Sequence, residues 1–149
     1  MFILSLSSRL ARRAGLAITL LMVPQIALAQ SCVVDIAAVE KSIARLETSY
    51  DDILSDISCD DPVKKAHRLM CDSSYQAGDN LWRMGRLDDL AWVYAYENAT
   101  KREVDRADPP RDSAFLAKRD ACTDAVCLCS ALIAHTNDSL GGESPYPGG

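Results

Sequence analysis

The clearest pattern in the sequence is an apolar stripe that begins near residue 35. Apolar side chains recur at alternating steps of three and four residues, and charged side chains occupy the positions between them. The stripe consists of Ile36, Val39, Ile43, Leu46, Tyr50, Ile53 and Ile57. This spacing predicts an amphipathic helix over about residues 35–58, with one face turned towards a core.

Four further stretches have helical spacing, and residues that cap or break helices bound them. They span 62–71, 79–107, 111–122 and 123–140. Asp60 or Asp61 is expected to cap the first of these helices. Gly85 can kink the second, which Asp108-Pro109-Pro110 ends because proline cannot continue a helix. No stretch shows sustained strand alternation. The expected fold class is therefore all-α, a small helical bundle of four to five helices.

The first thirty residues have the pattern of a secretion signal. Three arginines precede an uncharged apolar run over 14–29, which ends in the small-x-small tripeptide Ala27-Leu28-Ala29. A retained membrane anchor is the alternative, but the run is short for a spanning helix and Pro24 interrupts it. We therefore expect residues 1–29 to be a signal peptide, 30–141 a helical domain and 142–149 a flexible tail.

Net charge narrows the class of partner. Without residues 1–29 the chain has 13 basic and 21 acidic residues, a net charge of −8. Such a surface is repelled by a phosphate backbone, which disfavours nucleic acid as a partner. It favours a basic protein, which the opposite field would attract. We expect no stable membrane insertion after cleavage of the signal, and the oligomeric state stays open.

All six cysteines lie beyond the predicted cleavage point, which favours three disulfides in an oxidising compartment. Cys127 and Cys129 would point in opposed directions on a helix and should have different partners. Cys122 can reach Cys127 across a corner at Thr123-Asp124, and Cys59 and Cys71 flank one short helix. The remaining pair is Cys32–Cys129. The predicted pairing is therefore 59–71, 122–127 and 32–129.

Two alternatives for the cysteines remain. A metal site could combine Cys122, Cys127 and Cys129 with a histidine, but the paired C-x-x-C spacing of common zinc sites is absent. Lipidation of Cys32 would leave an odd number of thiols. We expect neither a metal nor another cofactor.

The segment "FLAKRDACTDAVCLCSAL" resembles the end of the domain named for LprI-type lysozyme inhibitors. The similarity rests on Leu116, Arg119-Asp120, Cys122 and Cys127-Leu128, with Phe115 at a position where the family has tryptophan. Upstream, Cys59 and Met70-Cys71-Asp72 also fit the family pattern, so that the resemblance covers about residues 59–140. It implies a small secreted bacterial helical domain that binds lysozyme, and Cys32–Cys129 would be an added bridge.

No catalytic constellation is evident, and we do not expect an enzyme. His67 lies among basic residues and is expected in an exposed turn, whereas His135 is expected to be a surface or packing residue. Trp82 and Tyr94 are expected to face the core. The candidate partner-binding residues are two acidic pairs and an outward aromatic pair. They are Asp60, Asp61, Asp88, Asp89, Trp92 and Tyr96.

The preferred function is therefore binding in the bacterial periplasm or exterior. The first hypothesis is inhibition of a lysozyme or related cell-wall hydrolase by occlusion of its active-site cleft. The alternative is a periplasmic immunity or envelope-stress protein that binds another partner.

Overall fold

The structure is a computed structural model that describes residues 32–72 and 76–149, and the predicted signal peptide lies outside this range. Five α-helices and one 3-10 helix follow one another, and the described residues contain no strand. The α-helices are α1 (Ile36–Tyr50), α2 (Lys65–Cys71), α3 (Gln76–Thr100), α4 (Ser113–Asp120) and α5 (Ala125–Leu140), and the 3-10 helix is η1 (Gly141–Glu143). The predicted all-α fold class is confirmed.

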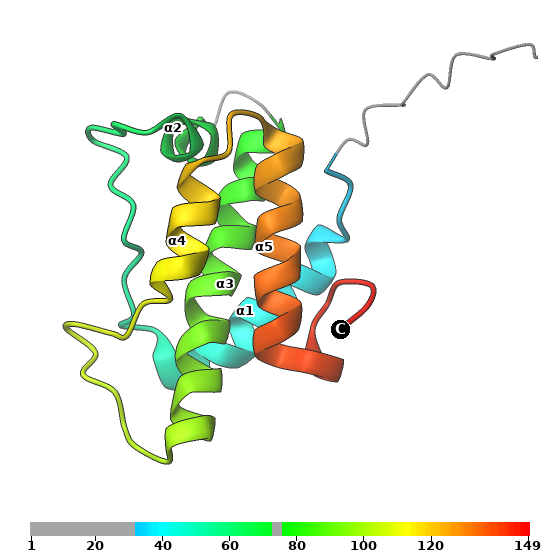
Figure 1. Ribbon diagram of the computed structural model, residues 1–149. Coiled ribbons are helices and arrows are strands. Elements are labelled where there is room, and N and C mark those ends of the chain that lie inside the picture. Colours follow the sequence, from blue (N-terminus) through cyan, green and yellow to red (C-terminus); the bar gives the residue numbers. More distant parts are fainter. Residues whose placement is uncertain (1–31, 73–75) are drawn as a thin grey trace, which may run out of the picture.

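Helix α3 is the centre of the bundle. Helices α1, α2 and α5 all pack on it, and α4 packs on α5 and α2 (Figure 1). The side chains of Leu81, Met84, Leu87 and Leu90 point from α3 into the core and are almost completely buried. Their spacing of three residues, together with the buried Ala91 four residues after Leu87, gives α3 a continuous apolar face, which explains why the other helices assemble around it.

Aspartates begin three of the helices. The Asp35 side chain accepts a hydrogen bond from the backbone N–H of Ala38 at the start of α1. Asp112 caps α4 in the same way, and Asp124 caps α5 by accepting from Cys127 N–H. These bonds satisfy N–H groups that have no partner within a helix. The turn and cap expected at Thr123-Asp124 are confirmed.

The helix predicted over 35–58 ends earlier, at Tyr50. Ile53 and Ile57 of the apolar stripe are still buried, but they belong to an irregular segment over residues 51–64, which we call the 51–64 loop. Side chains of arginines bond to carbonyl groups of this loop, as described below, and so replace the N–H partners that a longer helix would supply. The capping role predicted for Asp60 or Asp61 is wrong. Helix α2 begins only at Lys65, and both aspartates are exposed.

Helix α3 is continuous through Gly85, where a larger residue would collide with the methyl group of Met70 on α2. The helix ends at Thr100, before the predicted 107, because Lys101 adopts a left-handed conformation with φ of 56°.

The C-terminal segment 142–149, which was expected to be a flexible tail, packs against the bundle. Tyr146 is buried, and the Asn137 side chain of α5 bonds to Ser144 and to the carbonyl of Pro147.

Three disulfides connect these elements in the predicted pairing. Cys32–Cys129 joins the segment before α1 to α5, Cys59–Cys71 joins the 51–64 loop to the end of α2, and Cys122–Cys127 spans the corner between α4 and α5. The sulfur of Cys32 is therefore bonded to that of Cys129. Disulfides of this kind are typical of proteins that fold outside a reducing cytosol. Among the described helices, none combines the length and apolar character needed to cross a bilayer.

Candidate functional site

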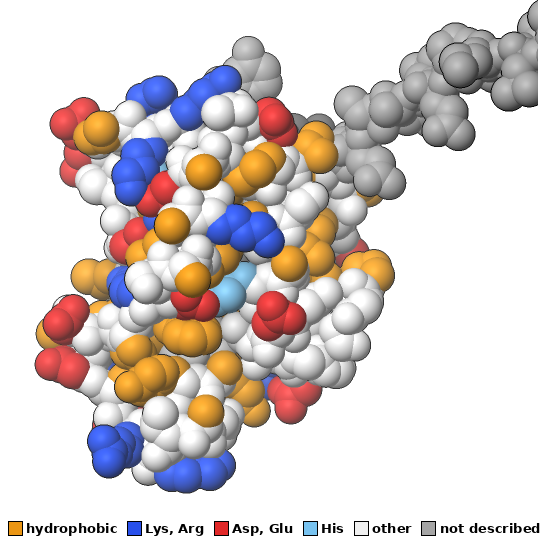
Figure 2. All heavy atoms as spheres, viewed as in Figure 1, with side chains coloured by type: hydrophobic (Ala, Val, Ile, Leu, Met, Phe, Trp, Pro, Cys, Tyr) orange, Lys and Arg blue, Asp and Glu red, His pale blue; other side chains and the backbone are white. Residues whose placement is uncertain are grey.

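The 51–64 loop is the most distinctive surface of the molecule. It runs along one edge of the bundle, beside α4, from the end of α1 to the start of α2 (Figure 1). Ile53 and Ile57 point inwards, whereas Leu54 and Val63 are 73% and 76% exposed. Apart from Asp56, whose pairing is described below, the loop has four exposed acidic residues. These are Asp51, Asp52, Asp60 and Asp61. Figure 2 shows acidic and hydrophobic side chains next to one another where the loop reaches α2.

Arginines from the rest of the protein hold this loop. Arg86 of α3 donates to the carbonyl oxygens of Asp51, at 3.2 Å, and Ile53. Arg111, in the segment between α3 and α4, donates to the carbonyl of Leu54 at 2.8 Å. Because the bonds go to the main chain, they restrain the backbone of the loop and not merely its side chains.

Two more arginines bind carboxylates of the loop. Arg106 donates to the Ser49 carbonyl and, at 2.9 Å, to Asp52. Arg119 of α4 forms a bidentate pair with Asp56, with nitrogen–oxygen distances of 2.8 and 2.7 Å. Two parallel bonds between a guanidinium group and a carboxylate fix orientation as well as distance. The 51–64 loop is therefore pre-organised, although it contains no regular secondary structure.

The Arg119–Asp56 pair continues into a network with α2. Arg119 is only 3% exposed, and its Nε donates to Asp120 at 3.0 Å. Asp120 also contacts the ring of His67 and the ammonium group of Lys64. Burial acts against ionisation of Asp120, but the bonds from Lys64, Arg119 and His67 outweigh it and lower its pKa to about 2. The prediction that His67 is exposed is wrong, because its ring packs against this carboxylate.

The second predicted acidic pair is not a contact surface. Asp88 is buried, with its carboxylate 2.8 Å from Nδ1 of His135 and 3.0 Å from the Thr136 hydroxyl. Asp89 forms an ion pair with Arg111 at 3.1 Å. Adjacent residues on a helix diverge, and because α3 is central, one carboxylate meets α5 and the other meets the segment that holds the loop. Both aspartates therefore have internal partners and are not accessible to a second protein.

The predicted aromatic pair does form, with the ring centres of Trp92 and Tyr96 6.4 Å apart. Tyr96 is exposed, but Trp92 is half-buried against the ring of His135. His135 has a packing role, since it stacks on Phe115 with 3.8 Å between ring centres. Tyr94 contacts the core as expected, whereas the prediction that Trp82 faces inwards is wrong because its side chain is 37% exposed.

Only Asp60 and Asp61 of the predicted contact residues therefore lie on the 51–64 loop. Leu54 and Val63, its exposed apolar residues, were missed. Leu54 falls outside the apolar stripe, and Val63 follows Pro62. The exposure of both side chains can be inferred from the sequence only once α1 is known to end at Tyr50. In the described part of the chain, no three histidine, cysteine or acidic side chains are grouped so that they could hold a metal ion.

Comparisons with protein-family models, with curated proteins and with solved structures gave no match.

Replacement of Arg119 tests the role of the buried pair. Arg119→Ala leaves Asp56 and Asp120 without their main partner and should lower the free energy of unfolding by about 3–5 kcal/mol. Arg119→Lys keeps the charge but loses the bidentate geometry, so its free energy of unfolding should lie between those of the native protein and Arg119→Ala. Urea unfolding measures the effect. Arg45→Ala is the control, since it removes an exposed pair with Glu143 and should cost less than about 1 kcal/mol. Equal losses for Arg45→Ala and Arg119→Ala would contradict a structural role for the buried pair.

Asp89 makes stability depend on pH. Burial, together with the neighbouring carboxylates of Asp88 and Asp56, raises its pKa to about 7 despite the opposing charge of Arg111. The folded protein thus holds a proton that the unfolded chain releases near pH 4, so the contribution of Asp89 to stability falls as pH rises through this interval. The advantage of Asp89→Asn over the native chain should grow by roughly 1.4 kcal/mol per pH unit between about pH 5 and 7. Unfolding of both proteins across this range measures it, and parallel curves would exclude a raised pKa.

Proposed function

We propose that this chain acts outside the cytosol of a bacterium as an inhibitor of a basic lysozyme or related cell-wall hydrolase, and that the 51–64 loop occludes the cleft of the enzyme. The observation that carries the proposal is the combination of accessible acids and apolar side chains on a loop whose backbone is already restrained. The resemblance to LprI-type lysozyme inhibitors supports the same class of partner.

Charge supports the approach of the two proteins. The chain beyond residue 29 has a net charge of −8, and five of its acids lie on the 51–64 loop. Lysozymes of animal origin are strongly basic, so an opposite field would increase the rate of encounter. Asp56, Asp88, Asp89 and Asp120 are paired internally and would contribute little to specific contacts.

The apolar residues suit the cleft itself. Retaining and inverting glycosidases have two carboxyl groups in the cleft, which would repel an inserted aspartate. Leu54 and Val63 carry no charge and could enter, while the aspartates contact the basic surface around the cleft. Because arginines restrain the loop before binding, little conformational entropy would be lost on association.

Paired variants of the loop test this mechanism. In a turbidity assay with several classes of lysozyme, the purified oxidised protein should inhibit at least one class. Val63→Asp and Leu54→Asp should each raise the inhibition constant about thirtyfold or more, as expected for the loss of a central contact. Val33→Asp is the matched control, because Val33 is also highly exposed, at 83%, but lies outside the loop. It should leave inhibition unchanged.

Neutralisation of the acids should act differently. Asp60→Asn/Asp61→Asn should slow association and weaken its dependence on salt, with a smaller effect on dissociation. Rapid-mixing kinetics at low and high salt separate the two rates. Absence of inhibition at a large molar excess over every lysozyme class would remove the proposal, and equal effects of Val63→Asp and Val33→Asp would remove the loop as the contact.

A further inference from the structure

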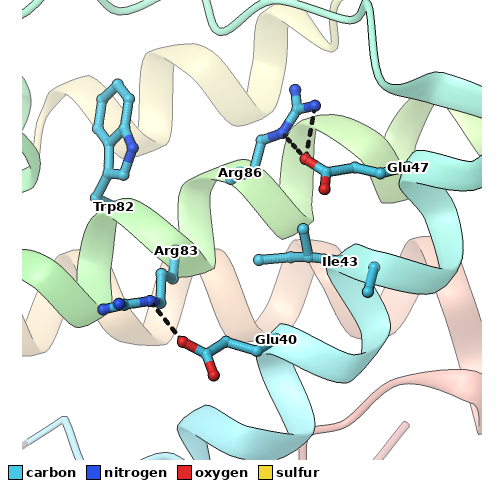
Figure 3. Close-up of a pocket in the computed structure, with 7 residues that line it drawn as sticks. Glu40, Ile43, Glu47, Trp82, Arg83 and Arg86 are labelled. Atoms are coloured by element: carbon cyan, nitrogen blue, oxygen red, sulfur yellow. Dashed lines mark hydrogen bonds and ion pairs between the residues drawn. The ribbon is translucent and has the colours of Figure 1, made fainter.

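A second surface feature lies between α1 and α3, around Trp82. The indole side chain stands at one end of a hollow of about 290 Å³, which Ile43 and Ala44 of α1 also line (Figure 3). A second hollow of about 190 Å³, lined by Met70 and the Cys59–Cys71 bridge, adjoins the same tryptophan. One exposed aromatic ring therefore borders two hollows, and we call the whole feature the Trp82 groove.

Ion pairs line the first hollow. Arg83 Nε lies 3.0 Å from Glu40 Oε1, and Arg83 also bonds to Asp79. Further along, Arg86 contacts Glu47 at 2.9 Å, and Figure 3 shows this pair on the side of the hollow opposite the indole. Each guanidinium group has a carboxylate partner on α1, so the two walls present donors and acceptors that are already held in position.

The balance of charge restricts the ligand. Glu40 and Glu47 offset Arg83 and Arg86, so the hollow offers no net charge in a protein that is otherwise acidic. An ionised peptide or nucleotide would have to break one of these pairs. A neutral molecule with many hydroxyl groups would not, because paired carboxylates still accept and paired guanidinium groups still donate further hydrogen bonds.

Trp82 supplies the apolar part of such recognition. An exposed indole offers a flat, polarisable face whose position costs little conformational entropy. Sugar rings have an apolar face of C–H groups and a rim of hydroxyls, which matches an aromatic ring beside fixed polar groups. The larger hollow, at about 290 Å³, lies at the lower end of the range of small-molecule sites and suits one or two rings.

From this geometry we infer that the Trp82 groove is a binding site for a neutral saccharide, with one sugar ring stacked on the indole and its hydroxyls bonded to the Glu40–Arg83 and Glu47–Arg86 pairs. The site is separate from the proposed inhibition of a hydrolase. It takes the glycan itself and not an enzyme that cleaves glycan.

The test uses the purified oxidised protein and tri-N-acetylchitotriose, with maltotriose and the anionic trigalacturonate as comparison ligands. Titration should give saturable binding of a neutral trisaccharide, and the indole N–H resonance of Trp82 should shift while that of Trp92 stays in place. The affinity should not depend on ionic strength between about 50 and 300 mM, because no net charge is neutralised.

Two variants make the result specific. Trp82→Ala should weaken binding about tenfold, and Trp82→Phe should retain part of it. Tyr96→Ala removes an aromatic side chain of similar exposure, 38%, outside the groove and should have no effect. No saturable binding of either neutral trisaccharide, binding of trigalacturonate alone, or equal affinities of Trp82→Ala and the native protein would each overturn the inference. Hydrolase inhibition is tested separately, by the Leu54→Asp and Val63→Asp variants.

Discussion

The organisation of the molecule depends on one buried charge. Arg119 is almost inaccessible to solvent, and a guanidinium group in that position is tolerable only with carboxylate partners. One partner is Asp56, which lies in the 51–64 loop, and the other is Asp120, which follows Arg119 in α4. Since Asp120 also contacts Lys64 and His67, the pairing of a single arginine sets the positions of α4, the 51–64 loop and α2.

This constraint also divides the aspartates into two classes. Those next to α3 and α4 have internal partners, and burial or ion pairing shifts the pKa of several of them. Those on the outer side of the 51–64 loop stay accessible. Several of the exposed acids that would suit a basic partner therefore lie where the backbone is restrained, and the interior carboxylates serve folding. Under the proposed function, binding and stability would use different members of one residue type.

Local patterns predicted much of this architecture, and long-range partners account for what they missed. The helices and the three disulfides follow from spacing, capping and the opposed directions of Cys127 and Cys129. The end of α1 did not follow, because periodicity continues through Ile53 and Ile57 while arginines far along the chain take up the loop carbonyls. The burial of Asp88 and the internal ion pair of Asp89 were missed for a related reason, since adjacent charges on a helix give no sign that both faces of that helix are covered.

The same reasoning explains why an irregular loop can be a rigid contact surface. Leu54 and Val63 are exposed at some cost, because their apolar area remains in water. The loop is nevertheless restrained, because the Cys59–Cys71 bridge ties it to α2 and arginines bind carbonyls of its first four residues. A helix would present side chains at fixed intervals of a cylinder, whereas an extended, braced segment can project them into a concave partner. Restraint by side chains, in place of backbone hydrogen bonds, therefore gives this small bundle a surface that its helices alone could not form.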